Sequence, residues 1–173
     1  MQMIVKITIG SWRFTWSMAP ITNIIGVNSK LADGNHIIMW DFDATPLQKV
    51  IANLWDIQEL YRLPNIYISE TSKGTGFHAW CLKKVSWRML VEILATTKDL
   101  DWNYFKYGIY RGHFTLRVSP KCGRTIKHVH TLVSRQKEDV TIHELRSWVK
   151  YETLADGRAS RKVELNIFAK EKG

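Results

Sequence analysis

The feature that most constrains the fold is a short apolar run that ends in two acids and leads into a helix. Residues 36–43 read His-Ile-Ile-Met-Trp-Asp-Phe-Asp, which is typical of a buried β-strand. Thr45 and Pro46 follow, and these residue types favour a helix N-cap and a first helical position. Apolar residues then recur at helical spacing over 47–61, and Pro64 ends the pattern. A strand and a helix joined so closely predict a layered fold in which the helix covers the strand.

Strand and helix patterns continue along the chain. Ser86 is the expected cap of a second helix over 87–96, and Thr141 that of a third over 142–151. Residues 11–16 are aromatic and compatible with a strand. Further strands are predicted over 3–9, 65–69, 77–82, 115–119, 126–133 and 161–168. This order predicts an α+β fold of the RRM-like or ferredoxin-like kind, with a mixed or antiparallel sheet and packed helices.

The composition is that of a globular protein with a core. Of the 173 residues, 45% are hydrophobic and 12% are aromatic, which is too apolar for a disordered chain. We therefore expect a single domain over residues 1–173. Cys81 and Cys122 are too few for a disulfide scaffold, and no apolar run reaches the length of a membrane span. A reducing, cytoplasmic location is expected.

Positive charge is concentrated in the second part of the chain. Residues 1–105 carry ten Lys or Arg and nine Asp or Glu, whereas residues 106–173 carry fifteen and seven. A basic part with interleaved aromatic residues favours a polyanionic partner such as nucleic acid or nucleoside triphosphates. A generic basic surface is the alternative. The aromatic candidates for stacking on bases are Trp102, Tyr104, Phe105, Tyr107, Tyr110 and Phe114.

Asp41 and Asp43 are the sharpest chemical signal. They stand two apart at the end of the predicted strand, and the strand period of two places both on one face. Carboxylates so close repel each other unless a cation lies between them. A hard divalent ion, Mg²⁺ or Mn²⁺, suits that position. The alternative is a strand end at which Asp43 caps the following helix.

Two further segments carry groups that suit phosphate. The stretch from Ser69 to His78 ends one predicted strand, passes through a small-residue loop over 70–76 and begins the next strand. It offers backbone amides, hydroxyls and a lysine. It lacks the Walker spacing, and an ordinary hairpin turn is the alternative. Downstream, Arg117 and Ser119 share a predicted strand face and Lys121 lies just beyond it. These groups suit a triphosphate or a template backbone, and a solvated basic strand is the alternative.

Together and in this order, the motifs resemble the archaeo-eukaryotic primase superfamily, the primase-polymerases, over residues 36–121. Members carry an acid–hydrophobic–acid motif at a strand end, which Asp41 and Asp43 match. Their second motif is a small-residue loop that leads to a strand histidine, which the segment from Ser72 to His78 matches. Each motif alone is weak, but the two in order are fairly specific.

The resemblance also implies a third acid after an apolar residue. Asp101, after Leu100, is the best match, and Asp99 is the other candidate. By this resemblance the catalytic core would lie within 36–121, with a basic part over 106–173. The implied metal ligands are Asp41, Asp43 and Asp101. The implied nucleotide contacts are Ser72, Lys73, Gly74, Gly76, His78, Arg117 and Lys121.

The function implied is that of a template-dependent nucleotidyltransferase, a DNA primase or polymerase that acts in replication. It would transfer a nucleotide from an NTP or dNTP to a 3′-hydroxyl with two metal ions, Mg²⁺ or Mn²⁺. The implied partners are a single-stranded DNA template or primer and a helicase or other replication domain, in another chain or a further segment, with no membrane. A viral or plasmid origin would place the protein in the host cytoplasm.

A second reading starts from His128 and His130, which are two apart on a predicted strand. A His-hydrophobic-His strand resembles the metal motif of rolling-circle replication initiators and relaxases, which nick single-stranded DNA with a tyrosine. Their nucleophile is expected on a helix as Tyr-x-x-x-Lys. Tyr151 is the only tyrosine that follows, and Ala155 stands where lysine is expected. A third reading is a non-catalytic RRM-like nucleic-acid-binding module.

Overall fold

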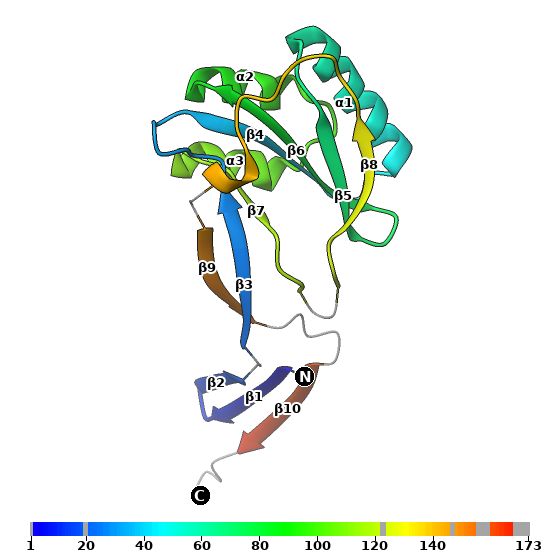
Figure 1. Ribbon diagram of the computed structural model, residues 1–173. Coiled ribbons are helices and arrows are strands. Elements are labelled where there is room, and N and C mark those ends of the chain that lie inside the picture. Colours follow the sequence, from blue (N-terminus) through cyan, green and yellow to red (C-terminus); the bar gives the residue numbers. More distant parts are fainter. Residues whose placement is uncertain (1, 19–20, 122–123, 146–147, 155–159, 168–173) are drawn as a thin grey trace, which may run out of the picture. The chain divides into compact units, whose positions relative to one another are not determined.

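The computed structural model describes residues 2–18, 21–121, 124–145, 148–154 and 160–167. It is an α+β fold, as the sequence predicts, with helices α1, α2 and α3 and sheets that are mainly antiparallel (Figure 1). The chain divides into two compact units, one of residues 1–23 and 151–173 and one of residues 24–150. That residues 1–173 form one catalytic domain stays a prediction.

The larger unit is built on a four-stranded antiparallel sheet. The strand order is β4 (His36–Phe42), β6 (Gly76–Val85), β5 (Ile66–Ser72) and β8 (Lys127–Leu132). Helices α1 (Leu47–Tyr61) and α2 (Trp87–Thr96) pack on one face, here called the helix-covered face (Figure 1). Their apolar stripes close over a core that includes Ile38, Trp40, Phe42, Leu54, Ile66, Phe77, Ala79, Leu90 and Phe114.

The other face of the sheet, here called the opposite face, carries a second apolar cluster. β3 (Ile21–Asn28) and β7 (Thr115–Arg117) pair antiparallel, in a sheet of order β7-β3-β9 that β9 (Trp148–Leu154) completes. The segment 138–145 is tied to β6, because Asp139 and Val140 each donate a backbone N–H to the carbonyl of Leu82. The cluster comprises Val27, Leu31, Ile37, Met39, Leu82, Leu116, Val140 and Leu145.

Helix α3 (Trp102–Arg111) closes the free edge of β4. The hydroxyl of Tyr104 donates to the carbonyl of Met39 over 3.0 Å, and the N–H of Asp101 donates to the carbonyl of Asp41 over 2.9 Å. These bonds satisfy two outward-facing carbonyls of an edge strand. The aromatic residues of this region split accordingly, since Tyr104, Phe105 and Phe114 pack inward. Exposed on the helix are Trp102, Tyr107 and Tyr110.

The helix predicted over 142–151 is wrong. Only a 3₁₀ turn forms, over Ile142–Glu144, and β9 (Trp148–Leu154) follows. The expected cap is real, because Thr141 and Glu144 form a reciprocal capping box. A cap only starts a helix, and the aromatic and β-branched residues that follow favour an extended strand.

The smaller unit contains a three-stranded sheet of order β10-β1-β2. β1 (Gln2–Ile9) pairs antiparallel with β2 (Trp12–Met18) and parallel with β10 (Ser160–Ile167). The turn between the first two strands uses Gly10, whose φ of +58° favours glycine. In the ranges described, no helix is both long and apolar enough to cross a membrane.

Candidate functional site

A row of polar side chains crosses the opposite face of the four-stranded sheet. Asp41 on β4 stands opposite His78 on β6, which stands opposite Ser69 on β5. Ser69 in turn stands opposite His128 on β8. Residues directly opposite each other in antiparallel strands project from the same face. The row therefore brings together an acid, two imidazoles and a hydroxyl from four separate strands.

Asp101 is held beside this row by the closure of the β4 edge. Its backbone N–H bonds the carbonyl of Asp41, and its side chain accepts from the N–H of Tyr104 as the N-cap of α3. The charge of Asp101 contributes to the raised pKa values of Asp41 and Asp43. Asp99 lies elsewhere, because its carboxylate accepts from Lys49 and Asn53, each over 2.8 Å. Of the two candidates for the third acid, Asp101 lies beside Asp41 and Asp99 is bonded to other residues.

Negative charge is unfavourable on Asp41 and Asp43, whose pKa values are both raised. Burial raises the pKa of Asp41 to about 7, with the charges of Asp43 and Asp101 adding to the effect and that of Arg117 opposing it. Burial, followed by the charge of Asp101, also raises the pKa of Asp43. Asp43 lies one residue beyond the end of β4 and is exposed. A positive ligand would relieve the repulsion among these acids.

His78 is buried and neutral. Its burial and the charge of Arg117 lower its pKa to about 3. Its Nε2 lies 3.5 Å from Oδ1 of Asp41, but a neutral imidazole makes no ion pair there. Among the described residues, its buried Nδ1 makes no hydrogen bond of ordinary geometry, and the backbone of Arg117 is the neighbouring group that opposes the fall in its pKa.

The glycine-rich loop between β5 and β6 is a tight turn. Gly74 has a φ of +76°, which favours glycine, and its N–H donates to the carboxylate of Glu70 over 2.7 Å. At Gly76 a Cβ would lie 2.9 Å from Ser72 Cβ, so a side chain there is excluded. The N–H of Thr45 donates to the carbonyl of Thr75 over 3.0 Å. The loop is therefore joined directly to the segment that follows Asp43.

The basic segment reaches the same end of the sheet. Arg117 influences the pKa of both Asp41 and His78, and its guanidinium donates to the carbonyl of Ser119 over 2.6 Å. Lys121 and Arg124 bond each other through their backbones. Arg124 also donates to the hydroxyl of Ser72 over 3.3 Å. Lys73 is exposed at the tip of the loop.

Sequence reasoning did not single out Ser69 or Arg124 as site residues. The pairing of β5 with β6 places Ser69 opposite His78, and a hairpin register around the glycine loop was the signal that could have found it. Arg124 comes close to Ser72 only through the path of the chain after β7, for which the sequence holds no local signal.

His128 and His130 do not share a face, contrary to the expectation from their spacing. A register shift in the pairing of β8 with β5 places His130 opposite Ile68 and His128 opposite Ser69. Ile68 belongs to the helix-covered core, whereas Ser69 lies in the polar row. One extra residue in a strand moves its later side chains to the other face. Tyr151 lies in strand β9, where the nuclease reading expects a helix.

In the part of the chain that the structure describes, no group of three or more His, Cys, Asp or Glu is placed to hold a metal ion. The donor set itself suits Mg²⁺ or Mn²⁺, because these ions take carboxylate oxygens and are commonly held by one or two carboxylates with substrate phosphates. A small hollow of about 180 Å³ opens at Asp41 and Asp101. The residues therefore fit a metal that arrives with a phosphate ligand.

Comparisons with protein-family models, curated proteins and solved structures find no match for this chain. The chemistry of the site therefore carries the functional conclusion.

Proposed function

We propose that the chain is a primase-polymerase-type catalytic domain that transfers nucleotides to a 3′-hydroxyl on a single-stranded DNA template. The observation that carries this proposal is the cluster of Asp41, Asp43 and Asp101 beside a buried neutral His78 and the charge of Arg117. The charges of Asp43 and Asp101 add to the raised pKa of Asp41 in a basic surrounding. Such an arrangement favours a divalent cation and a phosphate ligand together. An RRM-like binding module would have no use for these acids, which repel phosphate when no cation is bound.

One or two of the three aspartates would hold Mg²⁺ or Mn²⁺ together with the substrate phosphates, because among the described residues the three are not placed to hold an ion by themselves. When bound, the ions would lower the pKa of the attacking hydroxyl and neutralise charge on the triphosphate. The edge of β4 fixes Asp101 relative to Asp41 through a backbone hydrogen bond. Such fixed positions matter, since phosphoryl transfer depends on positioning and electrostatic stabilisation.

The remaining groups would bind the triphosphate. Arg117, Lys121 and Lys73 supply positive charge, and a neutral His78 donates one N–H to a phosphate oxygen. The N–H of Gly74 is already occupied by Glu70. A phosphate that used this amide would have to displace the Glu70 carboxylate, so we assign the loop's contribution to Ser72 and Lys73 first.

The test is nucleotide incorporation on single-stranded DNA with Mg²⁺ or Mn²⁺. The wild-type protein is compared with Asp41→Asn and with Asp56→Asn, which removes an exposed acid on α1 as a matched control. Metal-dependent products that Asp41→Asn abolishes and Asp56→Asn preserves are expected. DNA binding without products, unchanged in Asp41→Asn, would favour the binding module. Cleaved template joined to protein would favour the nuclease.

A further inference from the structure

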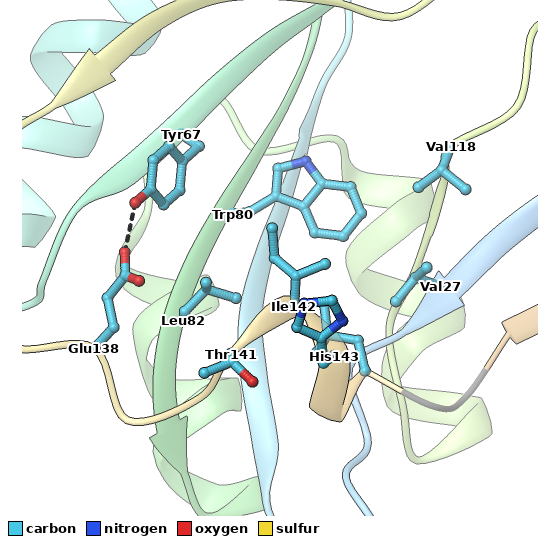
Figure 2. Close-up of a pocket in the computed structure, with 10 residues that line it drawn as sticks. Val27, Tyr67, Trp80, Leu82, Val118, Glu138, Thr141, Ile142 and His143 are labelled. Atoms are coloured by element: carbon cyan, nitrogen blue, oxygen red, sulfur yellow. Dashed lines mark hydrogen bonds between the residues drawn. The ribbon is translucent and has the colours of Figure 1, made fainter.

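A pocket of about 590 Å³ opens on the opposite face of the sheet, next to the polar row. Figure 2 shows Tyr67 and Glu138 on one side, Val27 and Val118 on the other, and the indole of Trp80 between them. Ile142 of the 3₁₀ turn faces Trp80 in the same view. The volume falls within the range of about 300–1,000 Å³ that small-molecule sites occupy.

The wall of the pocket formed by segment 138–145 is held in place. Asp139 and Val140 bond the Leu82 carbonyl, and Asp139 receives the N–H of Lys84 and a 2.9 Å ion pair from Lys83. This anchoring makes the pocket a preformed feature of the larger unit. A preformed cavity costs little ordering entropy when a ligand enters.

The pocket and the polar row are neighbours on two strands of the sheet. Trp80 and His78 are two apart on β6, and Tyr67 and Ser69 are two apart on β5. Residues two apart on a strand share a face and lie about 7 Å from each other. Val118, which directly follows Arg117, lines the side of the pocket across from Tyr67. A ligand with an anionic end at the row can therefore place a flat apolar end against Trp80.

We propose that this pocket receives the base of the nucleotide whose phosphates bind at the polar row. The proposal rests on the proposed function, and it adds that the base is bound by its face and not read by its edge. Two of the polar side chains of the walls are already paired, because Tyr67 donates to Glu138 over 2.6 Å and Thr141 donates to Glu144 over 3.0 Å, and His143 lies at the exposed rim. Stacking on an indole is tolerant of base identity. The site thus leaves base selection to the template.

The experiment measures binding of each of the four nucleoside triphosphates, and of inorganic tripolyphosphate, by calorimetry with Mn²⁺ present. Trp80→Leu is compared with wild type and with Trp55→Leu, which removes a 59% exposed indole on α1. Val118→Phe fills part of the pocket and keeps the tryptophan at position 80, so it is the variant to compare if Trp80→Leu fails to fold. Single-stranded DNA binding is measured for the same proteins.

We expect Trp80→Leu and Val118→Phe to weaken all four nucleotides roughly 5- to 100-fold, the range of a lost stacking contact. Tripolyphosphate binding is expected to be unchanged, and Trp55→Leu is expected to match wild type. Nucleotide affinities within twofold of wild type in both pocket variants, while tripolyphosphate still binds, would overturn the pocket assignment and leave the proposed function standing. Loss for one base alone, or loss only of DNA binding, would also overturn it. Failure of wild type to bind nucleotide or tripolyphosphate would overturn both proposals.

Discussion

The two faces of the four-stranded sheet differ in kind although their residues alternate along the same strands. Trp40 and Phe42 of β4 are fully buried under the helices, whereas Asp41 between them projects from the opposite face with 26% of its side chain exposed. On β6 the alternation repeats with Phe77 and Ala79 on either side of His78. The helix-covered face stabilises the fold, and the opposite face gathers the ionisable groups and the pocket.

Adjacent residues of one strand project from opposite faces of the sheet and have different neighbours. One of them can therefore pack in the core while the next belongs to the candidate site. Substitutions at adjacent residues of one strand should therefore affect either stability or activity.

Asp41→Asn is expected to lower nucleotide incorporation about 10³-fold, the scale of losing one preorganised electrostatic group. The folded state should not lose stability, because the substitution removes a buried charge that Asp43 and Asp101 repel. Single-turnover incorporation and thermal unfolding check the two parts. Activity within tenfold of wild type would remove Asp41 from the chemistry.

Trp40→Ala is the neighbouring substitution on the helix-covered face. It removes a fully buried indole and its 3.0 Å hydrogen bond to the hydroxyl of Thr97. The expected loss is about 3–5 kcal/mol in the free energy of unfolding, as for other large-to-small core changes. Urea unfolding measures it, with Trp55→Ala as an exposed control that should change by less than about 0.5 kcal/mol. Equal losses in the two variants would contradict the division between faces.

The sequence predicted the helix-covered face well because its signals are local. The strand over 36–43, the helix over 87–96 and the cap at Ser86 all appear in the structure, and Ser86 accepts from the N–H of Met89. These elements have apolar periodicity and caps that depend only on nearby residues.

The opposite face was less predictable because it depends on register and on chain segments far apart. The helix over 102–111 was missed, since Gly108 and a mixed polar pattern hide its period. The polar row needs the pairing of four strands, and the bulge that separates His128 from His130 has no sequence signal. Motif resemblance singled out Asp41 and His78. That they stand opposite each other in one polar row follows only from the pairing of β4 with β6.

Gly108→Ala is expected to affect both stability and nucleotide incorporation. A Cβ at Gly108 would lie 2.1 Å from Cε1 of Phe114, a ring at the centre of the helix-covered core. The helix must shift to make room, and it begins at the Asp101 cap. We expect a loss of about 1–3 kcal/mol in unfolding free energy, typical of overpacking, together with reduced incorporation.

The control for Gly108→Ala is Ile109→Ala, which replaces a 40% exposed residue of the same helix. Alanine at an open helix position would stabilise by about 1 kcal/mol relative to glycine, so the sign of the change is itself informative. A more stable Gly108→Ala protein would show that α3 is not pressed against Phe114.

The smallest expected effect is the part that His36 contributes to the pH dependence of stability from the helix-covered face. On the opposite face, the lowered pKa of His78 acts in the same direction and the raised pKa of Asp41 in the opposite one. Burial lowers the pKa of His36 below its usual 6.5, with the charges of Lys30 and His113 adding to the effect. Its ring also bonds the Ser29 hydroxyl at 3.0 Å and packs on Trp87. Because the unfolded chain binds this proton more readily, the stability present above pH 6.5 should fall as the pH drops toward the lowered pKa.

His36→Asn removes this titration while its amide oxygen retains an acceptor for Ser29. Unfolding midpoints in urea between pH 5 and 8 should therefore decline less on acidification in His36→Asn than in wild type. His143→Asn, on the exposed rim of the opposite-face pocket, should leave the wild-type slope intact. If His36→Asn kept the wild-type slope, or if His143→Asn flattened it as much as His36→Asn did, the burial of His36 would not be a source of the acid sensitivity in this range.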